Sequence, residues 1–151
     1  MRLDQRWEAL YDACRSDLYR VAVYLLGTSE AEEVVQDAFE RGMRERDFFD
    51  RVRVPAAWLR TVTVRLSVSR LRRRNVLERI HLRAPAPSNG VPDPELYEAL
   101  RSLSPSQRGA IVLRYFFGSD YAEIARALGM SEKSVGATLT RARAALRKEL
   151  S

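Results

Sequence analysis

The chain has 151 residues, which allows one medium domain or two very small ones. Its 46% hydrophobic and 30% charged residues are typical of a soluble globular protein, and its net charge of +6 favours a polyanionic partner. One cysteine and one histidine exclude an intrachain disulfide and a zinc cluster of the usual spacing. No apolar run reaches the about 18 residues of a membrane span and the N-terminus does not resemble a signal peptide, so we expect a cytoplasmic protein without membrane insertion.

The first predicted helix ends at Gly27, because glycine readily takes the backbone conformation that follows a helix. Cys14 lies on its apolar stripe and is expected in the core rather than as a reactive thiol. The residues of this inward stripe recur at helical spacing. They are Trp7, Leu10, Tyr11, Cys14, Leu18, Val21 and Leu25.

A capping box of Ser29 and Glu32 predicts the start of a second helix. Pro55 suits the first turn of a third helix. Phe48 and Phe49, between the two, are expected to lie partly in the core. The expected inward residues are Ala31, Val34, Val35, Ala38, Phe39 and Gly42 on the second helix and Trp58, Leu59, Val62 and Leu66 on the third.

Residues 84–94 contain four prolines and a glycine and therefore predict a linker rather than a helix or a central strand. In a polyproline-like conformation this linker spans roughly 34 Å, at about 3.1 Å per residue. It divides the chain into a predicted N-terminal domain, 1–83, and a predicted C-terminal domain, 95–151.

The C-terminal part contains further helix-start signals. Gly118 is expected to break the chain after the second of these helices, and Gly129 to form a tight turn before the last. No segment alternates with period two, so the predicted fold class is all-α, with two small helical domains joined by the Pro-rich linker. The signals are Asp93 with Pro94, Ser104 with Gln107, Asp120 with Glu123, and Ser131; the last helix is expected to turn Val135, Leu139, Ala142, Leu146 and Leu150 inward.

Residues 120–143 form the strongest local pattern, a short helix, a glycine turn and a second helix. This is typical of a helix-turn-helix, whose second helix enters the major groove of DNA. The alternative is an αα-hairpin within a helical bundle, which the offsets of the cap and the turn disfavour. The expected outward residues are Lys133, Gly136, Ala137, Thr140 and Arg141, with Arg143 and Arg147 near phosphate.

Residues 60–74 carry six arginines and no acidic residue. A helix with so much unpaired positive charge suits nucleic-acid phosphates, although a solvated surface is the simpler alternative. Two stripes carry the charge: Thr61, Arg65, Val68 and Arg72, and Thr63, Ser67, Arg70 and Arg74.

Residues 30–40 carry five acidic side chains and no basic one. Such a helix repels DNA and favours a basic protein partner, unless it is only a solvated face. Glu33, Gln36, Asp37 and Glu40 lie away from its apolar side. The sequence has no phosphate-binding loop, nucleophile elbow or metal-ligand cluster, so we expect no enzymatic activity, no cofactor, no metal and no small-molecule substrate.

Six stretches occur in an order that resembles extracytoplasmic-function (ECF) RNA polymerase sigma factors, group four of the housekeeping-sigma superfamily. The resemblance covers nearly the whole chain, and the stretches are strong together although each is weak alone. They are residues 30–39 (Glu-Ala-Glu-Glu-Val-Val-Gln-Asp-Ala-Phe), 55–62 (Pro-Ala-Ala-Trp-Leu-Arg-Thr-Val), 70–74 (Arg-Leu-Arg-Arg-Arg), 103–108 (Leu-Ser-Pro-Ser-Gln-Arg), 121–131 (Tyr-Ala-Glu-Ile-Ala-Arg-Ala-Leu-Gly-Met-Ser) and 140–147 (Thr-Arg-Ala-Arg-Ala-Ala-Leu-Arg).

The resemblance implies a role for each part. The first domain would be sigma region two, which binds the polymerase clamp and opens the minus-ten element. The second would be region four, which reads the minus-thirty-five element, so that together they direct transcription initiation of a stress- or signal-responsive regulon. The implied contact residues are Arg65, Ser69, Arg72, Arg73 and Arg74 for the minus-ten element, Lys133, Gly136, Ala137, Thr140, Arg141 and Arg143 for the recognition helix, and Glu33, Gln36, Asp37 and Glu40 for the polymerase.

The implied partners are core RNA polymerase and promoter DNA, and an anti-sigma factor stays open. The family usually carries Asn at Arg65, Asp at Ser69, Lys or Arg at Gly136 and often Arg at Thr138, and these departures leave the promoter sequence open. Two other hypotheses are a free-standing helix-turn-helix regulator, which would dimerise, and an adaptor that has lost DNA reading.

Overall fold

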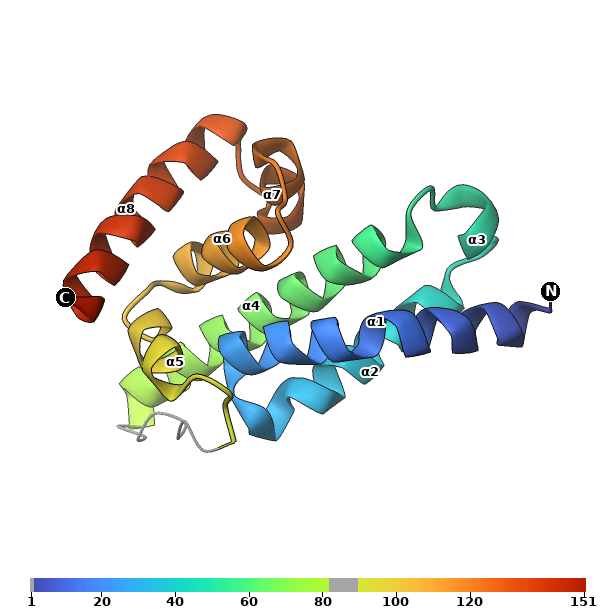
Figure 1. Ribbon diagram of the computed structural model, residues 1–151, viewed down its shortest axis with the longest axis horizontal. Helices are drawn as coiled ribbons and strands as arrows, with labels where there is room; N and C mark the ends of the chain where they lie inside the picture. The colour runs from blue at the N-terminus through green and yellow to red at the C-terminus, as the bar shows by residue number, and fades with distance from the viewer. Residues whose placement is uncertain (1, 82–89) are drawn as a thin grey trace.

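Helices account for nearly all of the computed structural model, which describes residues 2–81 and 90–151 and, of His81, the backbone only. No strand occurs within these ranges, as the all-α prediction requires. Residues 84–89 of the predicted linker lie outside them. The helices, shown in Figure 1, are α1 (Leu3–Leu26), α2 (Thr28–Arg44), α3 (Phe48–Arg51), α4 (Pro55–His81), α5 (Pro94–Leu100), α6 (Pro105–Phe116), α7 (Tyr121–Leu128) and α8 (Glu132–Leu150).

In the N-terminal half, residues 2–81, α1, α2 and α4 pack along one another (Figure 1). Gly27, at φ 88°, ends α1 and turns the chain directly into α2, which begins at Thr28. The predicted capping box of Ser29 and Glu32 is therefore wrong, because Ser29 already lies inside the helix. The predicted apolar face of α2 is confirmed, since all six of its residues, Ala31, Val34, Val35, Ala38, Phe39 and Gly42, are buried.

Aromatic rings close the end of this half where α3 lies. The ring centroid of Trp7 is 4.7 Å from that of Phe48 and 4.9 Å from that of Phe49, and Phe48 is 5.0 Å from Trp58. The expectation that Phe48 and Phe49 contribute to the core is confirmed, although they form the short helix α3 rather than a loop. Tyr11, predicted inward, is instead 40% exposed at the rim of a groove.

Substitution of two glycines with alanine should change the stability of this fold in opposite directions. A Cβ on Gly42 would lie 2.6 Å from Trp7 Cη2, whereas one on Gly136 would meet only the Tyr121 ring at an ordinary 3.6 Å. We expect Gly42→Ala to destabilise the protein by about 1–3 kcal/mol through overpacking. We expect Gly136→Ala to stabilise it by about 1 kcal/mol, the helix preference of alanine over glycine. Thermal unfolding of both variants checks this, and equal shifts would contradict the packing around Trp7.

The C-terminal half, residues 90–151, follows its predicted caps closely. Asp93 accepts a hydrogen bond from the Leu96 amide, and Ser104 and Asp120 form capping boxes with Gln107 and Glu123. Gly118 and Gly129 have positive φ angles at the predicted breaks. On α8, Val135, Leu139 and Ala142 are buried as predicted, but Leu150 is 48% exposed because the helix extends past its neighbours.

The two halves pack against each other, which the sequence did not predict. Figure 1 shows α6 lying between α4 and α8, and α6 contacts α1, α4 and α8. The rings of Tyr24 and Phe116 meet edge to face at 5.3 Å, and the Tyr24 hydroxyl accepts a hydrogen bond from the Asp93 amide. We call this packing of α4 and α1 against α6 and α7 the closed arrangement.

Candidate nucleic-acid interface

Helices α7 and α8 form the predicted helix-turn-helix. Asp120 caps α7, Gly129 at φ 66° turns the chain, and Ser131 accepts a hydrogen bond from the Ser134 amide at the start of α8. Lys133, Ala137, Thr140 and Arg141 are exposed on one side of α8, and Gly136 lies half-buried between them beside Tyr121. This face of α8 is therefore free to meet a ligand in the closed arrangement.

Two other residues of α8, beside the expected reading surface, are engaged by side chains of the C-terminal half. Arg143 Nε donates to the Tyr115 hydroxyl at 2.6 Å, and this hydrogen bond raises the pKa of Arg143 above its usual value. Thr138 is half-buried, with Oγ1 3.9 Å from Met130 Sδ. Any contact of Arg143 with DNA would have to compete with its bond to Tyr115.

The predicted DNA-facing stripe of α4 lies against the C-terminal half. Arg65 donates from Nε to the Ala127 carbonyl at 2.9 Å and from Nη2 to the Arg126 carbonyl, both at the end of α7. Arg72 donates to Ser106 Oγ at 2.8 Å, and Val68, between them on the stripe, is buried. Arg65 and Arg72, both expected to meet nucleic acid, are thus engaged by α7 and α6, while Ser69 and Arg73 stay exposed.

The second stripe of α4 packs against α2 instead of facing phosphates. Thr63 and Ser67 are fully buried, and their hydroxyls have no partner among the described residues. Arg70 lies 3.4 Å from Glu30, 3.2 Å from Glu33 and 3.8 Å from Asp37.

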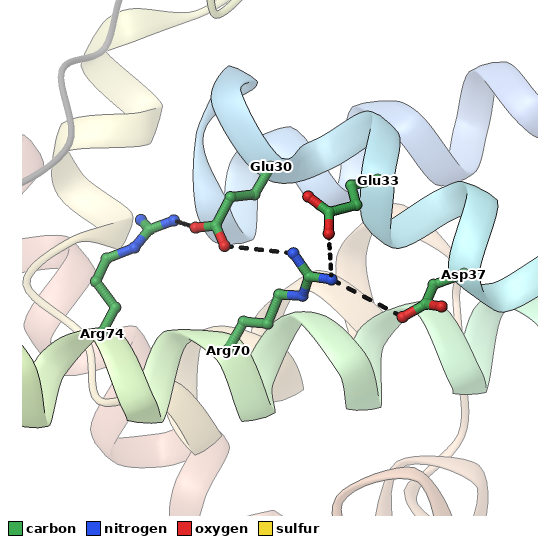
Figure 2. Close-up of polar contacts among 5 residues, drawn as sticks. All are labelled: Glu30, Glu33, Asp37, Arg70 and Arg74. Atoms are coloured by element: carbon green, nitrogen blue, oxygen red, sulfur yellow. Dashed lines mark hydrogen bonds and ion pairs between the residues drawn. The ribbon is translucent and has the colours of Figure 1, made fainter.

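Arg74 also pairs with Glu30 (Figure 2). The expectation of unpaired charge on this stripe is therefore wrong for Arg70 and Arg74, because acids 33 to 44 positions away in the sequence neutralise them. The hydrogen bond to Glu33 raises the pKa of Arg70.

The acidic face of α2 is divided by these pairs. Glu33 and Asp37 point toward Arg70 from one side of the helix (Figure 2). Gln36 and Glu40 lie on the other side, where they line a groove of about 830 Å³ between α1 and α2. We call it the α1–α2 groove. Its apolar lining is Leu3, Trp7, Tyr11, Val35, Phe39 and Met43, and its other acidic residues are Asp4, Glu8 and Glu32.

A second groove, of about 650 Å³, lies between α2 and α4 and contains side chains that the sequence did not single out. Arg41, Arg44 and Trp58 line it together with Arg65 and Ser69. We call it the α2–α4 groove. Basic side chains beside an aromatic ring commonly bind single-stranded nucleic acid. Its residues come from two segments of the chain, so only the packing of α2 on α4 identifies it.

Residues 2–81 and 90–151 give little support to a metal site, a reactive thiol or a membrane-spanning helix. They contain no group of three or more metal-ligating side chains. Cys14 is half-buried against the core, where burial raises the pKa of its thiol, as expected for a structural cysteine. Across the same ranges, none of the helices has the length and apolar character needed to cross a membrane.

The fold and the exposed face of α8 define a helical protein of the helix-turn-helix, DNA-binding class. Comparison with known proteins narrows this class. Residues 10–76 match the family model of sigma-70 region 2, and residues 94–146 match that of sigma-70, region 4. The ECF RNA polymerase sigma factor SigL of Mycobacterium tuberculosis is 32% identical over 155 residues, which cover 94% of this chain and 87% of SigL.

Two further relatives agree. The ECF sigma factor SigJ of Mycobacterium tuberculosis is 32% identical over 160 residues, and this chain spans 90% of its own length but only 48% of SigJ. The sigma factor RpoE of Bartonella quintana, solved in complex with the anti-sigma factor NepR, superposes with a TM-score of 0.72 at 25% identity over 97% of this chain and 95% of RpoE. The chain belongs to the ECF family of RNA polymerase sigma factors, which act in transcription initiation.

Proposed function

We propose that this sigma factor binds core RNA polymerase through α2 and reads promoter DNA through α8 and α4, and that it opens to do so. The exposed face of α8 at the end of a helix-turn-helix is the observation that carries DNA reading. In this proposal the chain acts in the cytoplasm, contributes no catalytic group, and leaves RNA synthesis to the polymerase. Its regions two and four would be the predicted domains 1–83 and 95–151.

The spacing of the two promoter elements requires the chain to open. Promoter elements at minus ten and minus thirty-five lie about 25 base pairs apart, which is about 85 Å at about 3.4 Å per pair. A compact chain of 151 residues has a radius of gyration of only about 15 Å. The closed arrangement therefore cannot place α4 and α8 on both elements at once. Opening would also release Arg65 and Arg72 from α7 and α6.

Once released, Arg65 would stand at the edge of the α2–α4 groove. Arg41 and Arg44 would attract the backbone of a separated strand, and Trp58 offers an aromatic ring at the groove wall. Ser69 and Arg73 are already exposed beside it on α4. We assign capture of the opened minus-ten strand to this groove, with Arg72 and Arg73 positioning phosphates.

Recognition of the minus-thirty-five element is assigned to Lys133, Ala137, Thr140 and Arg141 on α8. We expect Arg141→Ala to weaken promoter binding by about 1–3 kcal/mol, because an arginine fork on a guanine is the commonest specific base contact. Affinity of the assembled holoenzyme for a mapped promoter and for variants of its upstream element measures this effect. The exposed Lys148→Ala, at the far end of α8, is the control. Unchanged affinity and unchanged promoter preference would remove Arg141 from the interface.

Polymerase binding is assigned to the side of α2 that carries Gln36 and Glu40, continuous with the α1–α2 groove. Its apolar floor and acidic rim fit a partner helix with basic and apolar side chains. Glu33 and Asp37 adjoin this surface but also hold Arg70. Part of their charge is therefore neutralised by Arg70. Substitution of either acid should thus change both polymerase binding and the stability of the protein.

Charge reversals should distinguish these acids. We expect Glu40→Arg to weaken polymerase binding by about tenfold or more, which is about 1.4 kcal/mol. The stability of this variant should fall by only about 0.5 kcal/mol, because the pair that Glu40 forms with Arg44 is exposed. Asp37→Arg should weaken binding and also lower stability, because it places a second cation beside Arg70. Competition binding and thermal unfolding measure the two effects, with the exposed Glu149→Arg as control. If Glu40→Arg binds as the wild type does, the α1–α2 side is only a solvated face.

The decisive experiment is binding to purified core RNA polymerase in competition with a principal sigma factor. Displacement at a one-to-one ratio supports the proposal. Binding to duplex DNA without binding to polymerase would instead favour a free-standing regulator and remove the role assigned to α2.

A further inference from the structure

One buried charged residue, Arg108, is not among the residues proposed to contact the promoter. Arg108 on α6 is only 3% exposed; its Nε donates to the Tyr24 carbonyl at 2.9 Å, and its guanidinium lies 5.2 Å from the centroid of the Tyr97 ring. Its Nη2 is also buried and has no acceptor among the described residues. Burial lowers the pKa of Arg108 to about 10, so the group is still charged at neutral pH. A buried charge without an anionic partner is costly, which calls for an explanation.

Arg108 borders a pocket between the two halves of the closed arrangement. The pocket has a volume of about 150 Å³. A single water molecule needs only about 10–15 Å³ on this measure, so the pocket has room for a ligand of several heavy atoms, such as a phosphate ion. Its lining is mostly polar and comes from Leu71, Arg74, Asn75 and Glu78 on α4, Tyr97 on α5, and Arg101, Leu103 and Arg108 on or before α6.

Of the three arginines that line this pocket, Arg108 alone has no ion-pair partner among the described residues. Arg74 pairs with Glu30, and Arg101 lies 3.0 Å from the Glu98 carboxylate. Arg108 forms no ion pair with any described residue. The neighbouring Tyr97 hydroxyl raises its pKa, and the positive charges of Arg74 and Arg101 lower it by less. Glu78 borders the pocket but pairs with none of the three arginines. Three arginines therefore line one small polar space, and the buried guanidinium of Arg108 has no acid at ion-pair distance.

We propose that this pocket binds a phosphate group, held by the guanidinium groups of Arg108, Arg101 and Arg74. Arginine forks match the oxygen spacing of phosphate and bind it in two-point hydrogen bonds. Arg108 lies between packed helices, where the backbone of a duplex cannot follow, so the ligand is a small diffusible molecule. It is either inorganic phosphate or the phosphate end of an organic monoester or diphosphate.

A phosphate in this pocket would bridge α4 to α5 and α6. Because the pocket exists only in the closed arrangement, the ligand stabilises that arrangement by its binding free energy and opposes opening. A cellular phosphate compound would then hold the sigma factor closed. Binding by the free protein needs neither polymerase nor promoter, so it can fail or succeed independently of the proposed function.

The test is calorimetric titration of the full chain with inorganic phosphate, pyrophosphate and adenosine monophosphate, at millimolar concentrations and fixed ionic strength. We expect one-to-one binding of at least one of them, with no binding of chloride or acetate, and a melting temperature that rises with its concentration. Binding of inorganic phosphate alone identifies the free ion as the ligand. Tighter binding of pyrophosphate identifies a diphosphate group, and tighter binding of adenosine monophosphate identifies an organic monoester.

Variants separate this site from general attraction of anions. Arg101→Gln and Arg108→Lys should each weaken binding by about tenfold or more, since each removes a charged hydrogen-bond partner or its fork. Arg101→Gln covers the case in which Arg108→Lys fails to fold. Arg79→Gln, at an exposed position of α4 outside the pocket, should bind as the wild type does. If Arg79→Gln weakens phosphate binding equally, the anion is held only by the general positive charge of the protein, and the proposal is overturned.

Glu78 supplies the opposing test. If Glu78 itself neutralises Arg108 in solution, Glu78→Gln will lower stability and leave phosphate binding weak. If phosphate is the partner, Glu78→Gln removes a repelling charge and should tighten binding severalfold. Weaker binding in Glu78→Gln, or no binding of any of the three phosphate compounds by the wild type, overturns the proposal.

Discussion

Val68→Glu is expected to open the closed arrangement while leaving the N-terminal helices folded. Val68 is buried on α4, and a Cβ on Gly109 of α6 would lie only 2.9 Å from its Cγ2, so the two helices are in close contact there. A carboxylate at this position would be buried without room for water, at a cost of several kcal/mol. In the open chain the same carboxylate is solvated and lies three and four positions from Arg65 and Arg72, within pairing distance.

The measurement is small-angle scattering together with circular dichroism. Val68→Glu should raise the radius of gyration above the about 15 Å of a compact chain of this length, with helix content unchanged. Val76→Glu adds the same charge to the exposed side of α4 and should leave the radius unchanged. A compact Val68→Glu variant of normal stability would show that α4 and α6 are not held together through Val68.

Trp7→Ala should cost the protein about 3–5 kcal/mol of stability, the usual range for removal of a buried large aromatic side chain. Trp7 is 9% exposed and touches the rings of Phe39, Phe48 and Phe49, so its loss leaves α1, α2 and α3 without their common packing partner. Such a loss is a large part of the 5–15 kcal/mol that typically stabilises a domain.

Chemical unfolding followed by circular dichroism measures this change. Tyr11→Ala is the matched control, because Tyr11 is an aromatic residue of the same helix but is 40% exposed. We expect it to cost clearly less. Similar losses for the two variants would contradict the central place of Trp7 in the aromatic cluster.

Helix boundaries in this protein were predictable because they are set locally. Asp93, Ser104 and Asp120 cap their helices through hydrogen bonds to amides three residues away, and the sequence shows both partners. Ser29 is the exception, because Gly27 turned the chain before a serine cap was needed. The family, too, was predictable, since its motifs are short and ordered. The division into domains 1–83 and 95–151 stays a prediction.

Long-range partners were not predictable. The arginines of 60–74 have no acid within their own helix, so the sequence suggested unpaired charge, but helix packing brings Glu30 and Glu33 to Arg70. In the same way nothing local to Arg65 indicates that the carbonyls at the end of α7 will accept its hydrogen bonds.

The bond between the Asp93 amide and the Tyr24 hydroxyl has a consequence for how firmly the halves associate. It fixes the chain to α1 just before α5 begins, twelve positions after the end of α4. A short connection gives the two halves an effective concentration in the millimolar range, whatever the amount of protein in the cell. Contacts too weak to join separate molecules can therefore hold these halves together. A partner that opens the chain competes against this local concentration rather than against a tight interface.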